Sequence, residues 1–169
     1  MSHRMSDIIK KKYSEKRRIG NIAEEIACMF LVKMGYKIIE QNYLKKWGEL
    51  DIVASQNNII HFIEVKSKVT REMEMNDNLV SQQVSRDSFT ASDFSLRVSH
   101  ENVDDEEYRP EDNVNFWKQK RMIRAIETYL LERRVSEDQE WQIDVITVKL
   151  DFFSKIATMK HIENVIFDI

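Results

Sequence analysis

The sequence predicts an α/β fold in which one mixed sheet is flanked by helices, in the order α-β-β-β-α-β-β. Apolar residues recur every three to four positions over 17–34 and again over 113–134, which indicates two helices that each bury one face. β-branched and aromatic residues, which favour strands, gather in four segments: 36–43, 48–66, 141–150 and 155–167. A sheet covered by helices buries both kinds of apolar face.

The composition is that of a soluble globular protein with one domain. Its 169 residues are 42% apolar and 33% charged, enough to build a sizeable core. A net charge of −3 and a pI near 5.9 give no overall attraction to nucleic acid, so any such attraction must be local. The single Cys28 cannot form an internal disulfide, which fits a reducing compartment. No apolar run approaches the roughly 20 residues of a membrane helix, so we expect a cytoplasmic protein without a membrane partner.

The first 18 residues predict a basic arm ahead of a single domain at 19–169. They hold seven Lys or Arg against Asp7 and Glu15. We interpret the arm as mobile or partly helical, and favour a solubilising tail because charge runs are usually solvated. The alternative is an arm that binds phosphates.

The first helix is predicted over 17–34, with Gly35 as its C-terminal stop. Glu24 and Glu25 lie beside its apolar stripe. A strand over 36–43 follows, and the basic residues Lys45 and Lys46 lead from it into the next strand.

Residues 48–66 predict two antiparallel strands joined by a tight turn. If that turn centres between Asn57 and Asn58, paired positions follow directly from the side-chain period of two. One face of the hairpin is then an apolar patch that we expect to be buried as a unit: Leu50, Ile52, Ile63 and Val65.

The other face of this hairpin carries charge. Asp51 lies opposite Glu64, and Glu49 lies opposite Lys66. Directly opposed like charges destabilise a sheet, so the two carboxylates require an explanation. One interpretation is a solvated hairpin with a surface salt bridge between Glu49 and Lys66. The other is a divalent cation, Mg²⁺ or Mn²⁺, held between the carboxylates, with Lys66 pointing at whatever the ion holds.

An acidic insertion is predicted at about 71–112. It contains twelve Asp or Glu against four Arg, with six serines, and it lacks the apolar residues needed to offset the entropy of ordering. We interpret it as disordered. Such a segment beside the hairpin would repel nucleic acid or occupy the groove until displaced.

The helix predicted over 113–134 is basic, with six Lys or Arg against two Glu. Asn113 is a plausible N-cap, and Trp117 belongs to the expected apolar side. One interpretation is an ordinary charged outer face. The other is a phosphate-binding surface, to which we assign six nucleic-acid-binding candidates: Lys45, Lys46, Lys118, Lys120, Arg121 and Arg124.

Two polar residues fall in the last strands. Asp144 lies within the apolar segment 141–150, where a structural role is favoured over a role beside the site. His161 has no neighbouring nucleophile in the sequence, so we interpret it as a surface or capping residue.

The hairpin motif resembles that of a known superfamily. Asp51 followed by Glu64-Val65-Lys66 resembles the D and (D/E)xK elements of restriction-endonuclease-like, or PD-(D/E)xK, nucleases. The strings 48–53 and 62–66 together resemble more closely the YraN-like uncharacterised protein family 0102. Similarity continues at Ala23-Glu24, where the family has glycine before the glutamate, and at 142–146 and 161–164.

The resemblance implies a restriction-endonuclease-like fold and a Mg²⁺-dependent endonuclease that hydrolyses DNA phosphodiester bonds, on branched or damaged DNA in repair or recombination. Asp51 and Glu64 would bind Mg²⁺ (or Mn²⁺), and Glu24 would complete the metal site. Glu49 would assist, and Lys66 would orient the attacking water. DNA is the expected partner and RNA the alternative. No residue pattern supports pairing of two chains.

A second class of function stays open from the sequence. The family's phenylalanine-glycine pair after the lysine is absent here, and the chain is acidic overall. Because a fold can persist after activity is lost, the alternative is a catalytically silent module that binds nucleic acid or protein.

Overall fold

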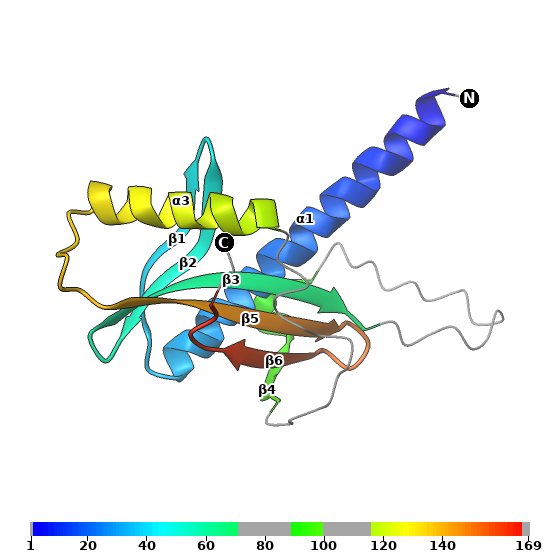
Figure 1. Ribbon diagram of the computed structural model, residues 1–169. Helices are drawn as coiled ribbons and strands as arrows, with labels where there is room; N and C mark the ends of the chain where they lie inside the picture. Colours follow the sequence, from blue (N-terminus) through cyan, green and yellow to red (C-terminus); the bar gives the residue numbers. More distant parts are fainter. Residues whose placement is uncertain (1, 71–88, 100–115, 167–169) are drawn as a thin grey trace.

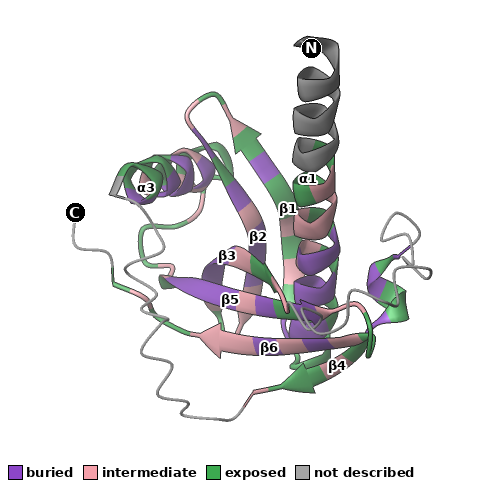
Figure 2. Ribbon diagram, turned by 90° about the vertical axis from the view of Figure 1, so that its right-hand side faces the viewer, coloured by how far each residue is buried: buried purple, intermediate pink, exposed green. Residues whose placement is uncertain are grey.

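A computed structural model describes residues 2–70, 89–99 and 116–166, and it confirms the predicted α/β class. Six strands form one mixed sheet in the order β1-β2-β3-β5-β6-β4. Helices α1 and α3 lie on opposite faces of this sheet (Figures 1 and 2). The arrangement is consistent with a restriction-endonuclease-like fold. The elements in chain order are α1 Ser2–Lys33, β1 Lys37–Lys45, β2 Gly48–Gln56, β3 Ile59–Val69, the short 3₁₀ helix η2 Ala91–Asp93, β4 Ser95–Val98, α3 Phe116–Glu132, β5 Trp141–Asp151 and β6 Ile156–Ile162.

Each helix covers its own hydrophobic core. Under α1, residues such as Ile26 pack with Ile52 and Ile63 of the sheet. Under α3, Ile126 packs with Val53 and Phe62. Neighbouring residues of one strand therefore point into different cores, as the alternation of side chains along a strand requires. Strands β2 and β3 lie between the two layers, which places the predicted hairpin at the centre of the molecule.

Helix α1 is longer than the sequence pattern predicts. It begins at Ser2 and runs without a break through the residues predicted as a separate basic arm, so that its N-terminal half projects beyond the sheet (Figure 1). Its predicted end at Gly35 is confirmed. Gly35 has φ +89°, and the N–H of Tyr36 donates to the carbonyl of Leu31 at 2.9 Å, as in the glycine-terminated helix ends that need a left-handed residue.

The predicted register of the central hairpin is confirmed for residues 52–56 against 59–63. The predicted pairs Asp51–Glu64 and Glu49–Lys66 lie beyond this ladder and are not paired in it. Ile52 pairs with Ile63, and Asn57 and Asn58 form the two-residue turn with φ of 51° and 65°, the left-handed pair that such turns require. The predicted single apolar patch is wrong in one residue. Leu50 packs in the core under α3, whereas Ile52 and Ile63 belong to the core under α1. Leu50 lies outside the paired part of β2 and β3, which ends at Ile52, so the alternation of the ladder does not extend to it.

The acidic insertion contains an ordered piece that the sequence pattern does not predict. Residues 71–88 and 100–112 lie outside the described residues, but β4 pairs in parallel with β6 and adds a strand to the sheet. Phe89 and Phe94 are buried and meet Phe152 edge-on, at centroid distances of 5.4 and 5.3 Å. The prediction of disorder over the whole segment is therefore wrong for 89–99, because these aromatic rings supply apolar area that the charge count hides.

Helix α3 begins at Phe116 in the structure, so the predicted N-cap Asn113 lies outside the described residues. The sequence pattern places Trp117 on the apolar side, but this residue is 68% exposed, and Met122 is buried instead. None of the helices in the described part of the chain is long and apolar enough to cross a membrane.

Candidate metal and nucleic-acid site

Asp51 and Glu64 approach each other where β2 and β3 separate. Beyond the Ile52–Ile63 pair, Oδ2 of Asp51 accepts a hydrogen bond from the backbone N–H of Val65 at 2.8 Å. Burial, and next to it the charge of Glu64, raises the pKa of Asp51 from its ordinary 3.8 to about 7. The predicted juxtaposition of two carboxylates is therefore present, and its electrostatic cost falls on Asp51.

Glu64 is a buried carboxylate that carries two ammonium groups. It is 2% exposed. Its Oε1 pairs with Nζ of Lys66 at 2.9 Å and with Nζ of Lys118 on α3. Lys66 therefore lies beside Glu64, as the motif implies, and does not form the surface salt bridge with Glu49 that the alternative interpretation offered. Lys118, one of the predicted nucleic-acid contacts, has its ammonium against the candidate metal ligand Glu64.

The two lysines respond differently to this setting. Burial lowers the pKa of Lys66, although the Glu64 charge opposes that effect. For Lys118, burial also lowers the pKa, but the charge and hydrogen bond of Glu64 outweigh it, so that its pKa is raised. Both shifts reflect competition between the loss of hydration and a close opposite charge.

Glu24 and Glu49 lie at the periphery of this pair. Glu24, on α1, is half-buried. Its pKa is raised by burial and by the charge of Glu49, while a hydrogen bond with Asn42 of β1 acts in the opposite direction. Glu49 is exposed on β2. The charge of Glu64 also raises the pKa of Glu24, so Glu24 interacts electrostatically with both Glu49 and Glu64. No three His, Cys, Asp or Glu side chains within the described ranges are close enough together to hold a metal ion.

The chemistry of Asp51 and Glu64 fits a hard divalent ion. Both offer carboxylate oxygens, the ligand type that Mg²⁺ prefers, and Mg²⁺ is commonly held by one or two carboxylates with water in the remaining positions. Among the described residues, no Lys or Arg forms an ion pair with Asp51. Its raised pKa marks a buried carboxylate whose charge the Val65 N–H and the Lys118 ammonium offset only in part, which a cation would relieve.

The predicted basic residues divide between the β1–β2 turn and α3. Nε of Arg121 donates to the carbonyl of Trp47 at 2.9 Å, and the guanidinium of Arg124 stacks 4.7 Å from the centre of the Trp47 ring. Lys45 pairs with Glu132 at 2.7 Å, which satisfies part of its charge within the protein. Lys46 and Lys120 are exposed. These contacts join the β1–β2 turn to α3. We call the surface that they form the basic rim and define it as Lys46, Lys120, Arg121 and Arg124.

Gly48 permits this close contact. A Cβ at that position would lie 2.5 Å from the carbonyl oxygen of Arg121, closer than any ordinary contact. The glycine of the hairpin motif therefore lets β2 pass directly under α3, which brings Lys118 within reach of Glu64.

A second buried polar cluster was not predicted. Asp144 is fully buried and accepts hydrogen bonds from His61 at 2.7 Å and His161 at 3.1 Å. It also accepts hydrogen bonds from the side-chain amide of Gln142 at 2.8 Å and from the backbone N–H of Asn164 at 2.9 Å. The structural role predicted for Asp144 agrees with these contacts. The prediction for His161 is wrong, because its side chain is 12% exposed and packs against Phe30 and Tyr36.

The one signal for this cluster was His61 itself. It stands inside the apolar run of a strand that is covered on both faces, and a buried histidine needs a hydrogen-bond partner. The sequence could not indicate which acid supplies it, because Asp144 lies 83 positions away.

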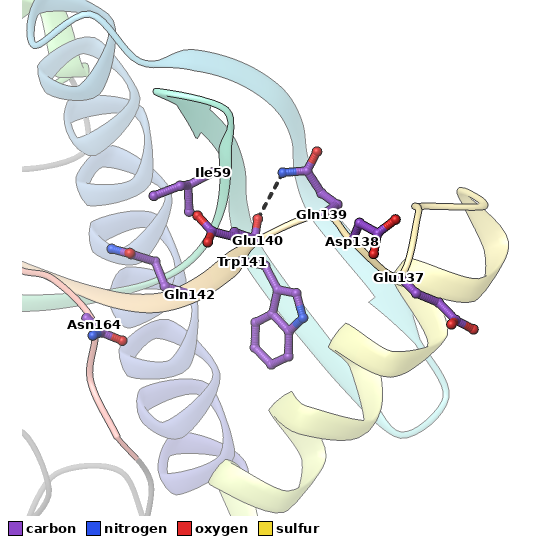
Figure 3. A pocket seen from close by; sticks show the side chains of 8 residues that line it. All are labelled: Ile59, Glu137, Asp138, Gln139, Glu140, Trp141, Gln142 and Asn164. Atoms are coloured by element: carbon purple, nitrogen blue, oxygen red, sulfur yellow. Dashed lines mark hydrogen bonds between the residues drawn. The ribbon is translucent and has the colours of Figure 1, made fainter.

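A shallow pocket of about 430 Å³ lies at the beginning of β5 (Figure 3). Its lining residues are Ile59, Glu137, Asp138, Gln139, Glu140, Trp141, Gln142 and Asn164. Ile59 begins β3, so the pocket is separated from Glu64 by five strand residues, or about 17 Å. It is therefore distinct from the paired carboxylates.

Fold and site together define a mixed α/β protein with paired acids and lysines at the centre of its sheet. The family model "Uncharacterised protein family UPF0102" matches residues 23–148. The chain belongs to this family, which is the YraN-like family. The match includes Glu24, the central hairpin, α3 and most of β5.

Individual relatives agree with this assignment. A UPF0102 protein of Alkaliphilus oremlandii is 28% identical over 148 residues, covering 88% of this chain and 97% of the relative. One from Campylobacter jejuni is 30% identical over 132 residues, 78% of this chain and 84% of the relative. One from Helicobacter hepaticus is 49% identical over 51 residues, 30% of this chain; the chain spans 46% of that relative's length.

Proposed function

We propose that the protein is a divalent-metal-dependent nuclease that hydrolyses phosphodiester bonds in DNA. One observation carries the proposal: Asp51 and Glu64 lie together in a partly buried place, beside two lysines and below a basic helix. Buried carboxylates that repel each other cost stability, and groups perturbed in this way are typical of functional sites.

Each residue has a chemical task in this proposal. A divalent ion, when bound, supplies Lewis-acid activation of water and of the phosphodiester. Asp51 and Glu64 contribute the oxygen ligands, and Glu24 extends the negative environment that attracts the cation. Lys66 lies 2.9 Å from Glu64, where its ammonium offsets charge that develops on the phosphate during reaction.

The basic rim supports DNA as the substrate. Arg121 and Arg124 are held against Trp47, so their positions are fixed before any ligand arrives. Preorganised cations lose less entropy on binding phosphates than free side chains do. Because the chain is acidic overall, this local surface must supply the attraction to nucleic acid. Branched or damaged DNA, as in repair or recombination, is the substrate to test first.

The test is a cleavage assay on single-stranded, duplex and branched DNA with Mg²⁺ or Mn²⁺. The wild type should cut at least one of these substrates. The double variant Asp51→Asn, Glu64→Gln should cut none, whereas the matched variant Asp138→Asn, Glu140→Gln, which changes two exposed acids of the β5 approach, should behave as wild type. Cleavage that survives loss of both Asp51 and Glu64 would reject the proposed site.

A second function is favoured by a specific observation. Glu64 is already paired with two ammonium groups, and no three metal-ligating side chains are gathered within the described residues. We therefore keep a binding module without turnover as the second candidate. It predicts metal-independent DNA binding that the Asp51 and Glu64 substitutions leave intact.

A further inference from the structure

Two ammonium groups contact one oxygen of Glu64, while the neighbouring Asp51 forms no ion pair with either and feels only the more distant charge of Lys118. Lys66 and Lys118 both contact Oε1 of Glu64. Asp51 instead receives the N–H of Val65. The charges of the two carboxylates are therefore unequally neutralised: two ammonium groups contact Glu64, and neither of them contacts Asp51.

The two lysines are not equally fixed. Lys66 comes from the same strand as Glu64 and its side chain is 25% exposed, whereas Lys118 reaches down from α3 and its side chain is 48% exposed. A long side chain that is half in water can turn outward without losing much packing, and it regains hydration when it does so. Lys118 is therefore the partner that can leave.

A divalent ion and the Lys118 ammonium cannot both contact Glu64 without strong mutual repulsion. An ion held between Asp51 and Glu64 would approach the oxygen that Lys118 contacts, and the ion and the ammonium would repel each other in a place with little water. Lys66 would remain, because its strand fixes it two residues from Glu64.

We infer that Lys118 is a displaceable internal cation: it neutralises Glu64 while no metal is bound, and it is released towards substrate phosphate when a divalent ion binds Asp51 and Glu64. The inference rests on the proposed function, because it assumes that these two carboxylates bind metal. It adds a regulation to that function. Metal binding delivers an extra ammonium to the basic rim, so metal and phosphate binding should strengthen each other reciprocally.

The first experiment uses the wild-type chain. Lysine acylation is followed by mass spectrometry with and without Mg²⁺, and Lys120, exposed on the same helix, serves as the internal control. Release predicts that Mg²⁺ accelerates acylation of Lys118 relative to Lys120. An unchanged ratio at a Mg²⁺ concentration that calorimetry shows to be saturating would overturn the inference.

The second experiment compares Mn²⁺ affinity in Lys118→Met, which keeps the aliphatic stem, with Lys120→Met and wild type. Removing the competing ammonium should tighten Mn²⁺ binding about tenfold, or about 1.4 kcal/mol, in Lys118→Met alone. A structural role for Lys118 predicts equal or weaker binding and would contradict displacement.

These experiments separate two kinds of failure. If wild type binds no Mn²⁺ at all, the metal site of the proposed function fails, and the displacement falls with it. If wild type binds Mn²⁺ through Asp51 and Glu64 but Lys118→Met binds it no tighter, only the displacement is rejected.

Discussion

The backbone N–H of Val65 on β3 donates to Oδ2 of Asp51 on β2 at 2.8 Å, so that a carboxylate occupies the place where the β2–β3 ladder would continue. This contact fixes one oxygen of Asp51 in a place where the charge of Glu64 is close enough to raise the pKa of Asp51. The paired part of β2 and β3 ends next to this contact, at Ile52 and Ile63, and Lys118 of α3 reaches Glu64 in the same place. The geometry around this point, and the cores that support it, lead to four predictions.

The first prediction concerns the pH dependence of stability through Asp51. Its pKa is raised from 3.8 to about 7 in the folded protein. Between these two pH values the folded state therefore holds a proton that the unfolded chain has released. The stabilising contribution of the neutral group is complete below about pH 4 and is lost as pH rises through 7. Asp51→Asn removes this loss. As pH rises from 4 to 8 without metal, the free energy of unfolding of Asp51→Asn relative to that of wild type, measured with urea, should increase by about 1 kcal/mol or more.

Asp138→Asn, at an exposed acid, is the control and should show no such shift. A constant difference between Asp51→Asn and wild type across this pH range would mean that Asp51 titrates normally.

The second prediction tests the close approach of β2 and α3. Gly48→Ala would place a methyl group 2.5 Å from the carbonyl oxygen of Arg121 and 3.3 Å from Cβ of Ala125. Relieving that overlap requires backbone movement, so the free energy of unfolding should fall by about 1–3 kcal/mol.

Gly20→Ala provides the matched comparison. Gly20 lies inside α1, and a methyl group at this position would have no neighbouring atom within 4 Å, so alanine there should stabilise by about 0.5–1 kcal/mol. Thermal unfolding of the two variants should move in opposite directions. Equal behaviour would show that the contact between Gly48 and α3 is not tight.

The third prediction concerns Asp144. Burial acts to raise its pKa, but hydrogen bonds from His161, Asn164, His61 and Gln142 outweigh burial and lower it. Its contribution to stability is therefore present above about pH 4 and is lost as pH falls through the lowered pKa. Asp144→Ala leaves buried donors without an acceptor and should cost about 3–5 kcal/mol in urea unfolding at pH 7. A loss below about 1 kcal/mol would contradict a structural role.

The fourth prediction separates the basic rim from general charge. Lys46→Ala with Lys120→Ala should weaken DNA binding and reduce the slope of log affinity against log salt by about 2, because each phosphate contact contributes about 0.9. Lys33→Ala with Lys37→Ala removes the same charge from exposed positions at the α1–β1 corner and should leave the slope unchanged. Equal effects of the two pairs of substitutions, measured by fluorescence anisotropy, would show that DNA does not bind at the basic rim.

Local patterns predicted most of the architecture. The turn at Asn57 and Asn58 and the alternating strands beside it fix the hairpin register, because both depend on neighbouring residues. The end of α1 at Gly35 is equally local. Strand β4 was missed because its order depends on Phe89 and Phe94 meeting Phe152, a contact over a long sequence separation within an otherwise acidic stretch.

The hairpin residues of the candidate site were predictable, but the position of Lys118 was not. Asp51, Glu64 and Lys66 lie directly beyond the paired part of one hairpin, so their proximity follows from local sequence. The position of Lys118 on Glu64 depends on how α3 packs over the sheet, which Gly48 controls. The pairing of His61 and His161 with Asp144 likewise arises where three strands meet, which no single segment reveals.

Calorimetric titration of Mn²⁺ into the metal-free protein tests the paired carboxylates as a metal site. We predict one ion per chain in wild type and in the Asp138→Asn, Glu140→Gln control, and no binding in the Asp51→Asn, Glu64→Gln variant. Circular dichroism must show the variant folded, because the amides remove the repulsion between the two carboxylates but leave Lys66 and Lys118 without their partner on Glu64. Mn²⁺ binding of equal affinity and stoichiometry in all three proteins would contradict the claim that Asp51 and Glu64 form a metal site.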